Sequence, residues 1–445
     1  MKNTLISTQS IKERAFLVGV ELEEHQALLS IEDSLEELAL LVKTAGLKVI
    51  GHETQRLVTP NPATYIGSGK VQEIKAIAES LHADVILFDD ELSPRNFREL
   101  ENVFGSHVRV IDRTTLILDI FAQHAQSHEG KLQVELAQYE YLLPRLTRAW
   151  THLARQAGGG AGRTGSVGGV GLRGPGETQL EVDRRRVRER ISRLKNDLEK
   201  VRQHRQRYRA NRKRSLIPVV TLVGYTNAGK STLLNNMTHA DVLVANQLFA
   251  TLDPTTRRLE LPGGNAVLMT DTVGFIQKLP TNLVAAFRAT LEEITESDLL
   301  LHIVDATHPN ALQQWRSVLD TLHEIDAEHI PMITVLNKID RLTMDGIDPA
   351  TLPEFTGAVK ISAAKSTGIG DLVEVIKKEL FERFTPISVT IPYSDGQLIS
   401  LFHEFGKIDK ISNNVGSVTI SGSIPGRLLA DFERFTQKQK SRAAT

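Results

Sequence analysis

The chain has 445 residues, no cysteine and a net charge of −1. The lack of cysteine excludes a disulfide framework and a cysteine-ligated zinc site. At roughly 150 residues per domain, the length predicts about three domains. No apolar run reaches the ~18 residues that a membrane-spanning helix needs, and the N-terminus lacks the apolar core of a signal peptide. We therefore expect a soluble, cytoplasmic protein.

The net charge hides a strong asymmetry. Residues 145–214 contain 20 Lys and Arg against 6 Asp and Glu, so this segment carries +14 and the rest of the chain −15. A basic block on an acidic body favours a polyanionic partner for the block. A solvated basic helix without such a partner is the alternative.

Residues 1–130 are predicted to form an α/β domain. Apolar runs predict strands at 14–21, 47–58, 84–88 and 108–111 and amphipathic helices at 31–45 and 71–81. This alternation is typical of a parallel sheet with helices packed on it. Gly67-Ser68-Gly69-Lys70 precedes a helix and can bind phosphate in principle. It lacks the full phosphate-loop spacing, so a capped turn is favoured.

Residues 131–214 predict an antiparallel coiled coil. Apolar residues follow heptad spacing at Leu132, Leu136, Tyr139, Leu143, Leu146, Trp150 and Leu153. Pro144 should kink this helix. A second seam runs from Leu180 to Tyr208. Between the seams, residues 158–176 contain ten glycines among 19, too many for a packed core. We expect this segment to form a loop at the tip of the coiled coil.

The basic residues of the tip and of the second helix favour an RNA partner. Flexible backbone combined with arginine suits structured RNA, in which shape and phosphate contacts dominate recognition. A plain linker is the alternative, but a Gly/Ser linker needs no charge. The predicted RNA-binding residues are Arg163, Arg173, Arg184, Arg185, Arg186 and Arg188.

Residues 215–383 are predicted to form a phosphate-loop domain. Residues 224–231 fit the pattern G-x-x-x-x-G-K-[ST] and lie between an apolar, β-branched run and a helix. In that setting, backbone N–H groups bind phosphate oxygens. Lys230 is expected to bridge the β- and γ-phosphates and Ser231 to ligate Mg²⁺. A glycine-rich turn without a ligand is the alternative.

Four further motifs follow in the order that a GTPase requires. Thr251 is expected to ligate Mg²⁺ when a γ-phosphate is present, Asp271 to hold it through water, and the Gly274 N–H to contact the γ-phosphate. Asp340 can accept hydrogen bonds from guanine N1–H and the 2-amino group, which adenine lacks. A backbone N–H after Ser362 can reach guanine O6. Each motif alone is common, but five in order at strand ends predict a guanine-nucleotide site.

The predicted nucleotide-binding residues are Gly224, Tyr225, Thr226, Asn227, Ala228, Gly229, Lys230, Ser231 and Thr232; Phe249, Ala250, Thr251, Leu252 and Asp253; Asp271, Thr272, Val273 and Gly274; Asn337, Lys338, Ile339 and Asp340; and Ser362, Ala363 and Ala364. The predicted metal ligands are Ser231 and Thr251, with Asp271 through water. The predicted catalytic groups are Lys230, Thr251 and Gly274.

Phe275 occupies the position where many GTPases carry a water-orienting glutamine. A phenyl ring cannot hydrogen-bond water, and phosphoryl transfer depends on positioning and charge stabilisation. We therefore predict slow intrinsic GTP hydrolysis and a partner that supplies or repositions the missing group. Residues 384–445 predict a small α/β domain, with strands at 387–391 and 415–421 and helices at 397–405 and 428–435, and without recognisable chemistry.

These motifs resemble those of the HflX-type GTPases, of the translation-factor-related class. The resemblance rests on residues 224–231, 249–255, 271–275 and the glycine-rich tip that leads into Glu177-Thr178-Gln179-Leu180. It implies an α/β fold, Mg²⁺-dependent GTP hydrolysis, and binding to the large ribosomal subunit and its RNA. It also implies hydrolysis stimulated by the ribosome, splitting of stalled 70S ribosomes under stress, and ATP binding near residues 67–70. Asymmetric docking on a ribosome suggests a monomer.

Three other classes of function stay open from the sequence. A kinase that uses the nucleotide as phosphoryl donor would need an acceptor pocket, and none is visible. A GTP-gated scaffold would act on protein partners without RNA, and steep salt dependence of binding to ribosomal RNA would separate it from the RNA-binding interpretation. An RNA-remodelling ATPase would not prefer GTP over ATP, so a GTP preference that vanishes on Asp340→Asn would argue against it.

Overall fold

The computed structural model describes residues 12–23, 28–105, 107–146, 179–214, 217–238, 248–249, 253–262, 265–278, 293–342, 352–382 and 384–436. The chain forms two compact units that alternate along the sequence. The N-terminal unit contains Met1–Ala210, Ala245–Asp253 and Ile276–Ala289, and the C-terminal unit contains Asn211–Val244, Pro254–Phe275 and Thr290–Thr445.

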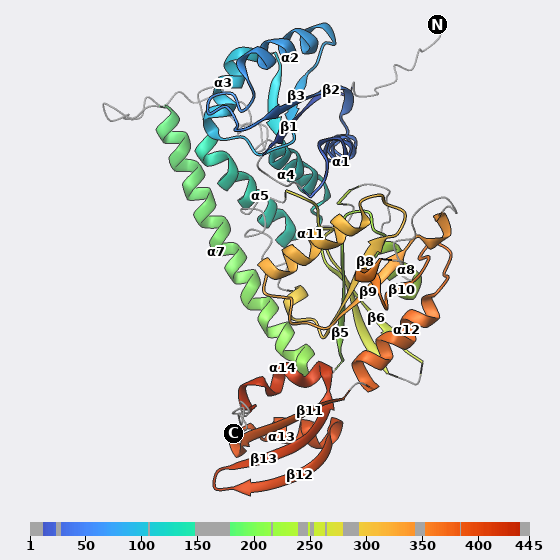
Figure 1. Cartoon of the computed structure of the whole chain (residues 1–445). Coiled ribbons are helices and arrows are strands. Elements are labelled where there is room, and N and C mark those ends of the chain that lie inside the picture. The colour runs from blue at the N-terminus through green and yellow to red at the C-terminus, as the bar shows by residue number, and fades with distance from the viewer. Residues whose placement is uncertain are drawn as a thin grey trace, which may run out of the picture. The chain divides into compact units, whose positions relative to one another are not determined.

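The N-terminal unit contains a four-stranded parallel sheet in the order β2-β1-β3-β4. Its strands are β1 (Arg14–Leu22), β2 (Lys48–Leu57), β3 (Val85–Phe88) and β4 (Arg109–Asp112), and its helices are α1 (Ile31–Thr44), α2 (Ser68–Ser80), α3 (Pro94–Phe104) and α4 (Arg113–His124) (Figure 1). The predicted strands and the two predicted helices are confirmed. Strand β2 lies on one side of β1 and β3 on the other, which creates a topological switch point at the carboxyl ends of β1 and β3.

Helices α3 and α4 were not predicted from the sequence. Each begins with a side-chain cap: Ser93 and Asn96 form a capping box before α3, and Asp112 accepts from the Thr115 N–H before α4. Both caps sit in stretches that resemble polar turns. The apolar faces of both helices are buried: Phe97 of α3 belongs to the buried cluster of the sheet, and Phe121 of α4 is also fully buried.

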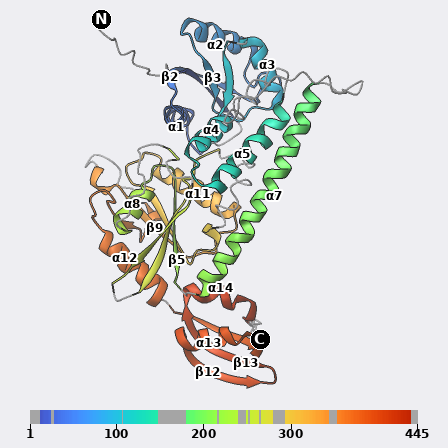
Figure 2. The ribbon, with the colours of Figure 1, turned by 180° about the vertical axis from the view of Figure 1, so that it is seen from behind.

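A pair of long helices completes the N-terminal unit. Helix α5 (His128–Leu142) is followed by a 3₁₀ turn at Leu143–Arg145, where Pro144 ends the helix, and α7 spans Gln179–Arg214. Part of each predicted seam is confirmed, because Leu132, Leu136 and Leu194 pack in one buried cluster, with Tyr139, Ile191, Leu198 and Val201 against it. Arg184 near the start of α7 hydrogen-bonds the Leu146 carbonyl beyond the end of α5, so the helices are antiparallel (Figures 1 and 2). The predicted glycine-rich tip lies outside the described residues.

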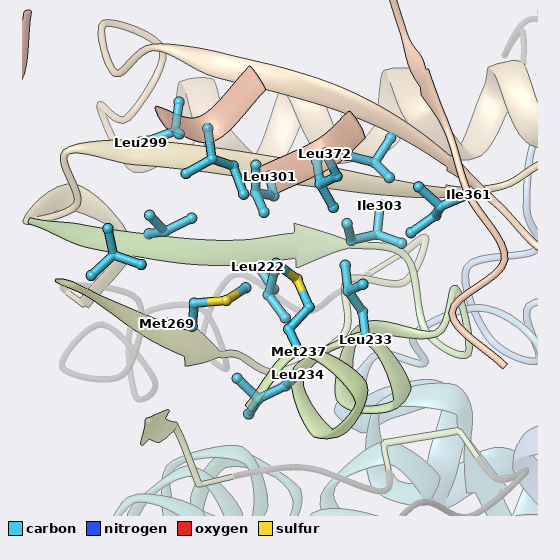
Figure 3. Packing of buried hydrophobic residues seen from close by; sticks show 14 of the residues in the cluster. Leu222, Leu233, Leu234, Met237, Met269, Leu299, Leu301, Ile303, Ile361 and Leu372 are labelled. Carbon is cyan, nitrogen blue, oxygen red and sulfur yellow. The ribbon is translucent and has the colours of Figure 1, made fainter. Parts of the chain in front are cut away.

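The C-terminal unit is built on a six-stranded sheet in the order β10-β9-β8-β5-β7-β6, in which only β6 is antiparallel to its neighbour. The strands are β5 (Val219–Gly224), β6 (Thr255–Glu260), β7 (Ala266–Asp271), β8 (Leu299–Asp305), β9 (Met332–Asn337) and β10 (Val359–Lys360), and the helices are α8 (Lys230–Thr238), α11 (Ala311–Glu324) and α12 (Ile369–Lys377). The apolar, β-branched run before the phosphate loop forms β5, inside this sheet. Leucines of the sheet pack with Leu233, Leu234 and Met237 of α8 and Leu372 of α12 in one buried cluster (Figure 3).

A three-stranded antiparallel sheet in the order β11-β13-β12 forms the last part of the chain. Its elements are β11 (Phe384–Pro392), α13 (Gly396–Phe405), β12 (Lys407–Asn414), β13 (Ser417–Pro425) and α14 (Leu429–Phe432). Strand β12 was missed because its sequence is mostly polar, and it is an edge strand whose residues are mostly exposed. None of the described helices is long and apolar enough to cross a membrane.

Candidate functional site

The phosphate loop follows β5 and depends on two glycines in unusual conformations. Gly224 has φ +151° and Gly229 has φ +98°. A Cβ at Gly224 would collide with the Ile303 carbonyl, and one at Gly229 with the Asn337 amide. Only glycine therefore fits both the backbone and the space at these two positions.

Lys230 lies at the first turn of α8, folded back over the loop. Its Nζ donates to the carbonyls of Gly224 (3.0 Å) and Tyr225 (2.9 Å). Burial lowers the pKa of Lys230 to about 8, and Asp271 acts in the opposite direction. The hydroxyl of Thr226 is buried without a hydrogen bond in the described part of the chain. A buried cation and a buried hydroxyl at the head of a helix are suited to a phosphate.

Ser231 and Asp271 supply oxygen ligands of the kind that Mg²⁺ prefers. The Ser231 hydroxyl donates to Asp271 Oδ2 at 2.5 Å. Ser231 lies in the first turn of α8, and Asp271 ends β7 directly beside Leu222 of β5. A hydroxyl and a carboxylate meeting beside a phosphate loop fit the magnesium site that the sequence predicts.

Gly274 and Phe275 lie against the phosphate loop through their backbones. A Cβ at Gly274 would approach Thr226 Cα to 2.8 Å and Lys230 Nζ to 3.1 Å. The Phe275 N–H donates to the Gly224 carbonyl (3.1 Å), and the Thr226 N–H donates to the Phe275 carbonyl (2.8 Å). The Phe275 side chain is buried, at 3% exposure. The position of the water-orienting glutamine in other GTPases is thus held by a buried apolar ring.

The base-recognition motifs are joined by Asn337. Its Nδ2 donates to the Ala228 carbonyl (2.8 Å) and its Oδ1 accepts from the Ala363 N–H (2.9 Å). The Ser362 hydroxyl donates to Asp340 Oδ1 (2.6 Å), and this hydrogen bond lowers the pKa of Asp340. Asp340 is therefore kept ionised as a pure acceptor, the state needed to pair with guanine donors.

Lys338 adopts a left-handed conformation with φ 65°, and its Nζ donates to Asp305 Oδ2 at 2.6 Å. This contact ties the loop after β9 to the end of β8. The predicted motifs at residues 224–231, 271–274, 337–340 and 362–364 are thus brought together at one edge of the six-stranded sheet, within the C-terminal unit.

Comparison with known proteins agrees with this geometry. The family models described as GTP-binding GTPase N-terminal, GTP-binding GTPase Middle Region and 50S ribosome-binding GTPase match residues 32–122, 124–212 and 219–338. The GTPase HflX of Alkalihalophilus pseudofirmus is 51% identical over 75% of this chain and 77% of its own length. That of Escherichia coli strain K12 is 41% identical over 96% of each chain.

The chain belongs to the HflX family of GTPases. It is accordingly an enzyme that hydrolyses GTP, with a ribosome-binding GTPase domain. Among solved structures it is similar to SsGBP in complex with GDP, at 27% identity and a TM-score of 0.46, over 83% of this chain and 98% of that one.

Two predicted nucleotide-binding residues make their described contacts elsewhere. Phe249 packs edge-on against Phe121 of α4, with ring centroids 4.5 Å apart. The Asp253 carboxylate accepts from the backbone N–H groups of Gln126 (2.9 Å) and Ser127 (2.8 Å). In this structure both residues therefore make their contacts within the N-terminal unit, to which they belong. Between them, Ala250, Thr251 and Leu252 lie outside the described residues.

The structure also places residues that no motif indicated. Asn236 of α8 donates to the Ala363 carbonyl (3.2 Å) and to Ser366 (2.6 Å), which supports the loop predicted to contact guanine O6. Gln277 and Lys278, just beyond Gly274, belong to the N-terminal unit and hydrogen-bond Ser34 and Asp89 within it. Their partners are distant in sequence, so no local pattern could have identified them.

Among the predicted RNA-binding residues, Arg185, Arg186 and Arg188 are exposed on α7, and Arg184 is half-buried. Arg163 and Arg173 lie outside the described residues. Arg190, on the same helix, forms a two-pronged ion pair with Glu135 of α5 at 2.8 Å for each bond. Some arginines thus hold the helix pair together, and others extend from it.

The alternative phosphate site at residues 67–70 is occupied by internal contacts. The Gly67 N–H donates to Gln55 Oε1 (2.9 Å), and Lys70 Nζ pairs with Glu53 (2.6 Å) and Glu73 (3.0 Å). These contacts favour the capped-turn interpretation at the start of α2.

Proposed function

We propose that this GTPase binds the large ribosomal subunit through ribosomal RNA and splits stalled 70S ribosomes into subunits under stress, acting in the cytoplasm as a monomer. One observation carries the proposal: a chain whose GTPase domain matches a 50S ribosome-binding model also has a long helix pair with exposed arginines. Phosphate contacts by arginine supply most of the affinity for RNA of defined shape.

In this proposal the residues at the sheet edge bind and orient GTP. Lys230 places its charge at the β- and γ-phosphates, and the Gly274 N–H contacts the γ-phosphate. Asp340 accepts hydrogen bonds from guanine N1–H and the 2-amino group. Ser231 and Thr251 would ligate Mg²⁺, and Asp271 would hold it through water. When bound, Mg²⁺ supplies charge neutralisation at the β- and γ-phosphate oxygens.

Phe275 leaves the GTPase site without a side chain that orients the attacking water, so hydrolysis depends on the ribosome. The buried ring cannot orient water, and its backbone is fixed to the phosphate loop by two hydrogen bonds. A group supplied or repositioned by the large subunit then completes the site. Docking of the helix pair displaces contacts between the subunits, and hydrolysis serves release.

The direct test is GTP turnover with purified large subunits added or withheld. Groups supplied in trans to GTPases raise kcat by ~10³ or more, so we expect stimulation of at least about a hundredfold. Deleting residues 158–176 should remove most of it while leaving GDP binding intact. Equal turnover with and without subunits would contradict the proposal. Splitting measured by sedimentation should also proceed with a non-hydrolysable GTP analogue.

A GTP-gated scaffold for protein partners is the second candidate, and salt dependence separates the two. RNA binding should weaken steeply with salt, and replacing Arg185, Arg186 and Arg188 with glutamine should lower the slope by about one for each phosphate that is no longer neutralised. Lys200→Gln is a matched control, because Lys200 lies on the same helix and pairs with Asp197 at 2.9 Å. An unchanged slope in the triple variant would favour the scaffold.

A further inference from the structure

The two loops that flank the phosphate site belong in part to the N-terminal unit. That unit includes Ala245–Asp253 and Ile276–Ala289. Asp253 follows Thr251 by two residues, and Ile276 follows Gly274 by two residues. Thr251 and Gly274 are the two residues predicted to respond to a γ-phosphate. The chain next to each of them is therefore bound by the unit that does not contain the nucleotide site.

Asp253 holds the first loop at the N-terminus of α5. Its carboxylate accepts the N–H groups of Gln126 and Ser127 and also bonds the Ser127 hydroxyl. Ser127 is itself the N-cap of α5, accepting from the Gly130 N–H at 2.8 Å. A carboxylate at this position is favoured both by the unpaired N–H groups and by the helix dipole.

Gly130, in the first turn of α5, leaves the space for Asp253. A Cβ at this position would collide with the Asp253 carboxylate. Gly130 is not among the glycines with positive φ, so the backbone does not require glycine there. Glycine inside a helix is less favourable than alanine. The close approach of Asp253 accounts for a residue that α5 alone would disfavour.

Lys278 holds the second loop at the carboxyl edge of the N-terminal sheet. Its Nζ donates to Asp89 Oδ2 and Asp90 Oδ1, both at 2.6 Å. The preceding Gln277 donates to Ser34 at 2.8 Å. Asp89 directly follows β3, at the topological switch point where open α/β sheets bind their ligands. In this protein that position is taken by the Lys278 side chain, which pairs with Asp89 and Asp90.

We propose that Asp253 and Lys278 are positioning residues that couple the nucleotide state of the two loops to the α5–α7 helix pair. A change in the first loop acts on the N-terminus of α5, and α5 packs on α7 through Leu132, Leu136 and Leu194. Because coupling between sites is reciprocal, a ligand on the helix pair must alter nucleotide affinity by the same factor. The inference rests on the GTPase activity and not on the identity of the ribosomal partner.

Hydrogen exchange of the full-length protein tests the first contact directly. The Gln126 and Ser127 amides donate to Asp253, so their exchange reports whether the carboxylate is in place. Exchange is compared between GDP and a non-hydrolysable GTP analogue for the wild type, Gly130→Ala, Asp253→Ala and Gly396→Ala. The last is a matched control, since Gly396 begins α13 and an added Cβ there meets nothing within 4 Å.

We expect the wild type and Gly396→Ala to show a nucleotide-dependent difference at these amides. A hydrogen bond to a charged group contributes about 1.5–3 kcal/mol, which is about a ten- to hundredfold change in exchange. Gly130→Ala and Asp253→Ala should lose the difference, while phosphate-loop amides still respond to nucleotide. The proposal is wrong if Gly130→Ala keeps the difference, or if the wild type shows none.

Variants of Lys278 test the second contact by turnover. Lys278→Met should change the kcat for GTP several-fold with little change in GDP affinity, and Lys278→Arg should restore the wild-type value because it keeps the charge. Asp90→Asn combined with Lys278→Met should add nothing to Lys278→Met alone. Wild-type turnover for Lys278→Met, or an equal change in Lys278→Arg, would overturn this half of the proposal.

Discussion

The two parallel sheets of this protein place opposite charges in the same topological position. In the C-terminal unit, β5 has β7 on one side and β8 on the other, and Lys230 follows at the carboxyl end. In the N-terminal unit, β1 lies between β2 and β3, and Asp89 follows β3 at the carboxyl end. Both positions are switch points, where side chains from the strand ends converge.

Burial acts on the two groups in opposite directions. It lowers the pKa of Lys230 to about 8 and raises the pKa of Asp89 to about 6. Each buried charge needs a counter-charge to be stable. For Asp89 the chain supplies it through Arg113 and Lys278, each at 2.6 Å. For Lys230 a nucleotide phosphate is the natural source. The same position in a parallel sheet can thus bind a ligand or form an internal ion pair. The outcome depends on whether a ligand or the chain itself supplies the counter-charge.

Removing the internal counter-charge should have the largest effect. Arg113 is fully buried and pairs with both Asp89 and Glu37. Arg113→Met would leave two buried carboxylates without it, and breaking a buried ion pair costs about 3–5 kcal/mol. We expect a loss of that size in the unfolding free energy of the N-terminal unit, measured by urea denaturation followed by circular dichroism.

Arg56→Ala is the matched control for this experiment. Arg56 pairs with Glu23 at 3.5 Å, and both side chains are exposed, at 67% and 48%. An exposed pair contributes about 0–1 kcal/mol because solvent screens it. If Arg113→Met cost no more than Arg56→Ala, the carboxylates at this edge would not depend on an internal counter-charge.

The difference between the two edges also explains what the sequence could predict. The guanine site is encoded in short motifs, because each residue lies at or just beyond the end of a buried strand: Lys230 after β5, Asp271 at the end of β7, Asn337 at the end of β9. Parallel strands bring such ends together. The second edge has no motif. Asp89 and Lys278 are 189 residues apart, and only the tertiary fold brings them into contact.

The same limit applies to elements and to single residues. Buried strands such as β1 and β3 were predicted because their residues are apolar and often β-branched, whereas polar edge strands such as β12 were not. Asp253 was assigned to the nucleotide because it lies in a switch-like motif. Its observed partners, Gln126 and Ser127, belong to a helix N-terminus that gives no sign of needing a remote carboxylate.

Acidification should change the stability of the two units in opposite directions, because the pKa of the buried Asp89 is raised and that of the buried His302 is lowered. Asp89 has a folded pKa of about 6 against 3.8 unfolded, so the native N-terminal unit binds the proton more tightly and gains stability as pH falls below about 6. Burial, with the charge of Lys230, lowers the pKa of His302 in β8 to about 3 from 6.5. The unfolded state then binds the proton more tightly, and the C-terminal unit loses stability below about pH 6.5.

At pH 5 the expected change is about 2 kcal/mol lost through His302 and about 1 kcal/mol gained through Asp89, at 1.36 kcal/mol per pH unit. Native-state hydrogen exchange of β8 and β3 amides between pH 7 and pH 5 measures each unit separately. His302→Phe keeps an aromatic ring beside Trp315 and should remove most of the loss in β8. Parallel shifts in both sheets would contradict the opposite titrations.

The smallest expected effect is the pH dependence of GDP affinity, which tests the charge of Lys230. Because the pKa of Lys230 is about 8 with Asp271 nearby but no phosphate bound, and phosphate stabilises the charged form, GDP binding above that pH must take up a proton. Affinity should therefore stay constant below about pH 8 and fall up to tenfold for the next pH unit, equivalent to about 1.4 kcal/mol. Titration with a fluorescent GDP analogue from pH 7 to pH 9 measures this fall. Arginine stays charged throughout this range, so Lys230→Arg, even if it binds more weakly, should show a flat profile. A wild-type profile equally flat would mean that Lys230 keeps its proton without a phosphate, and the counter-charge at both edges would then come from the chain itself.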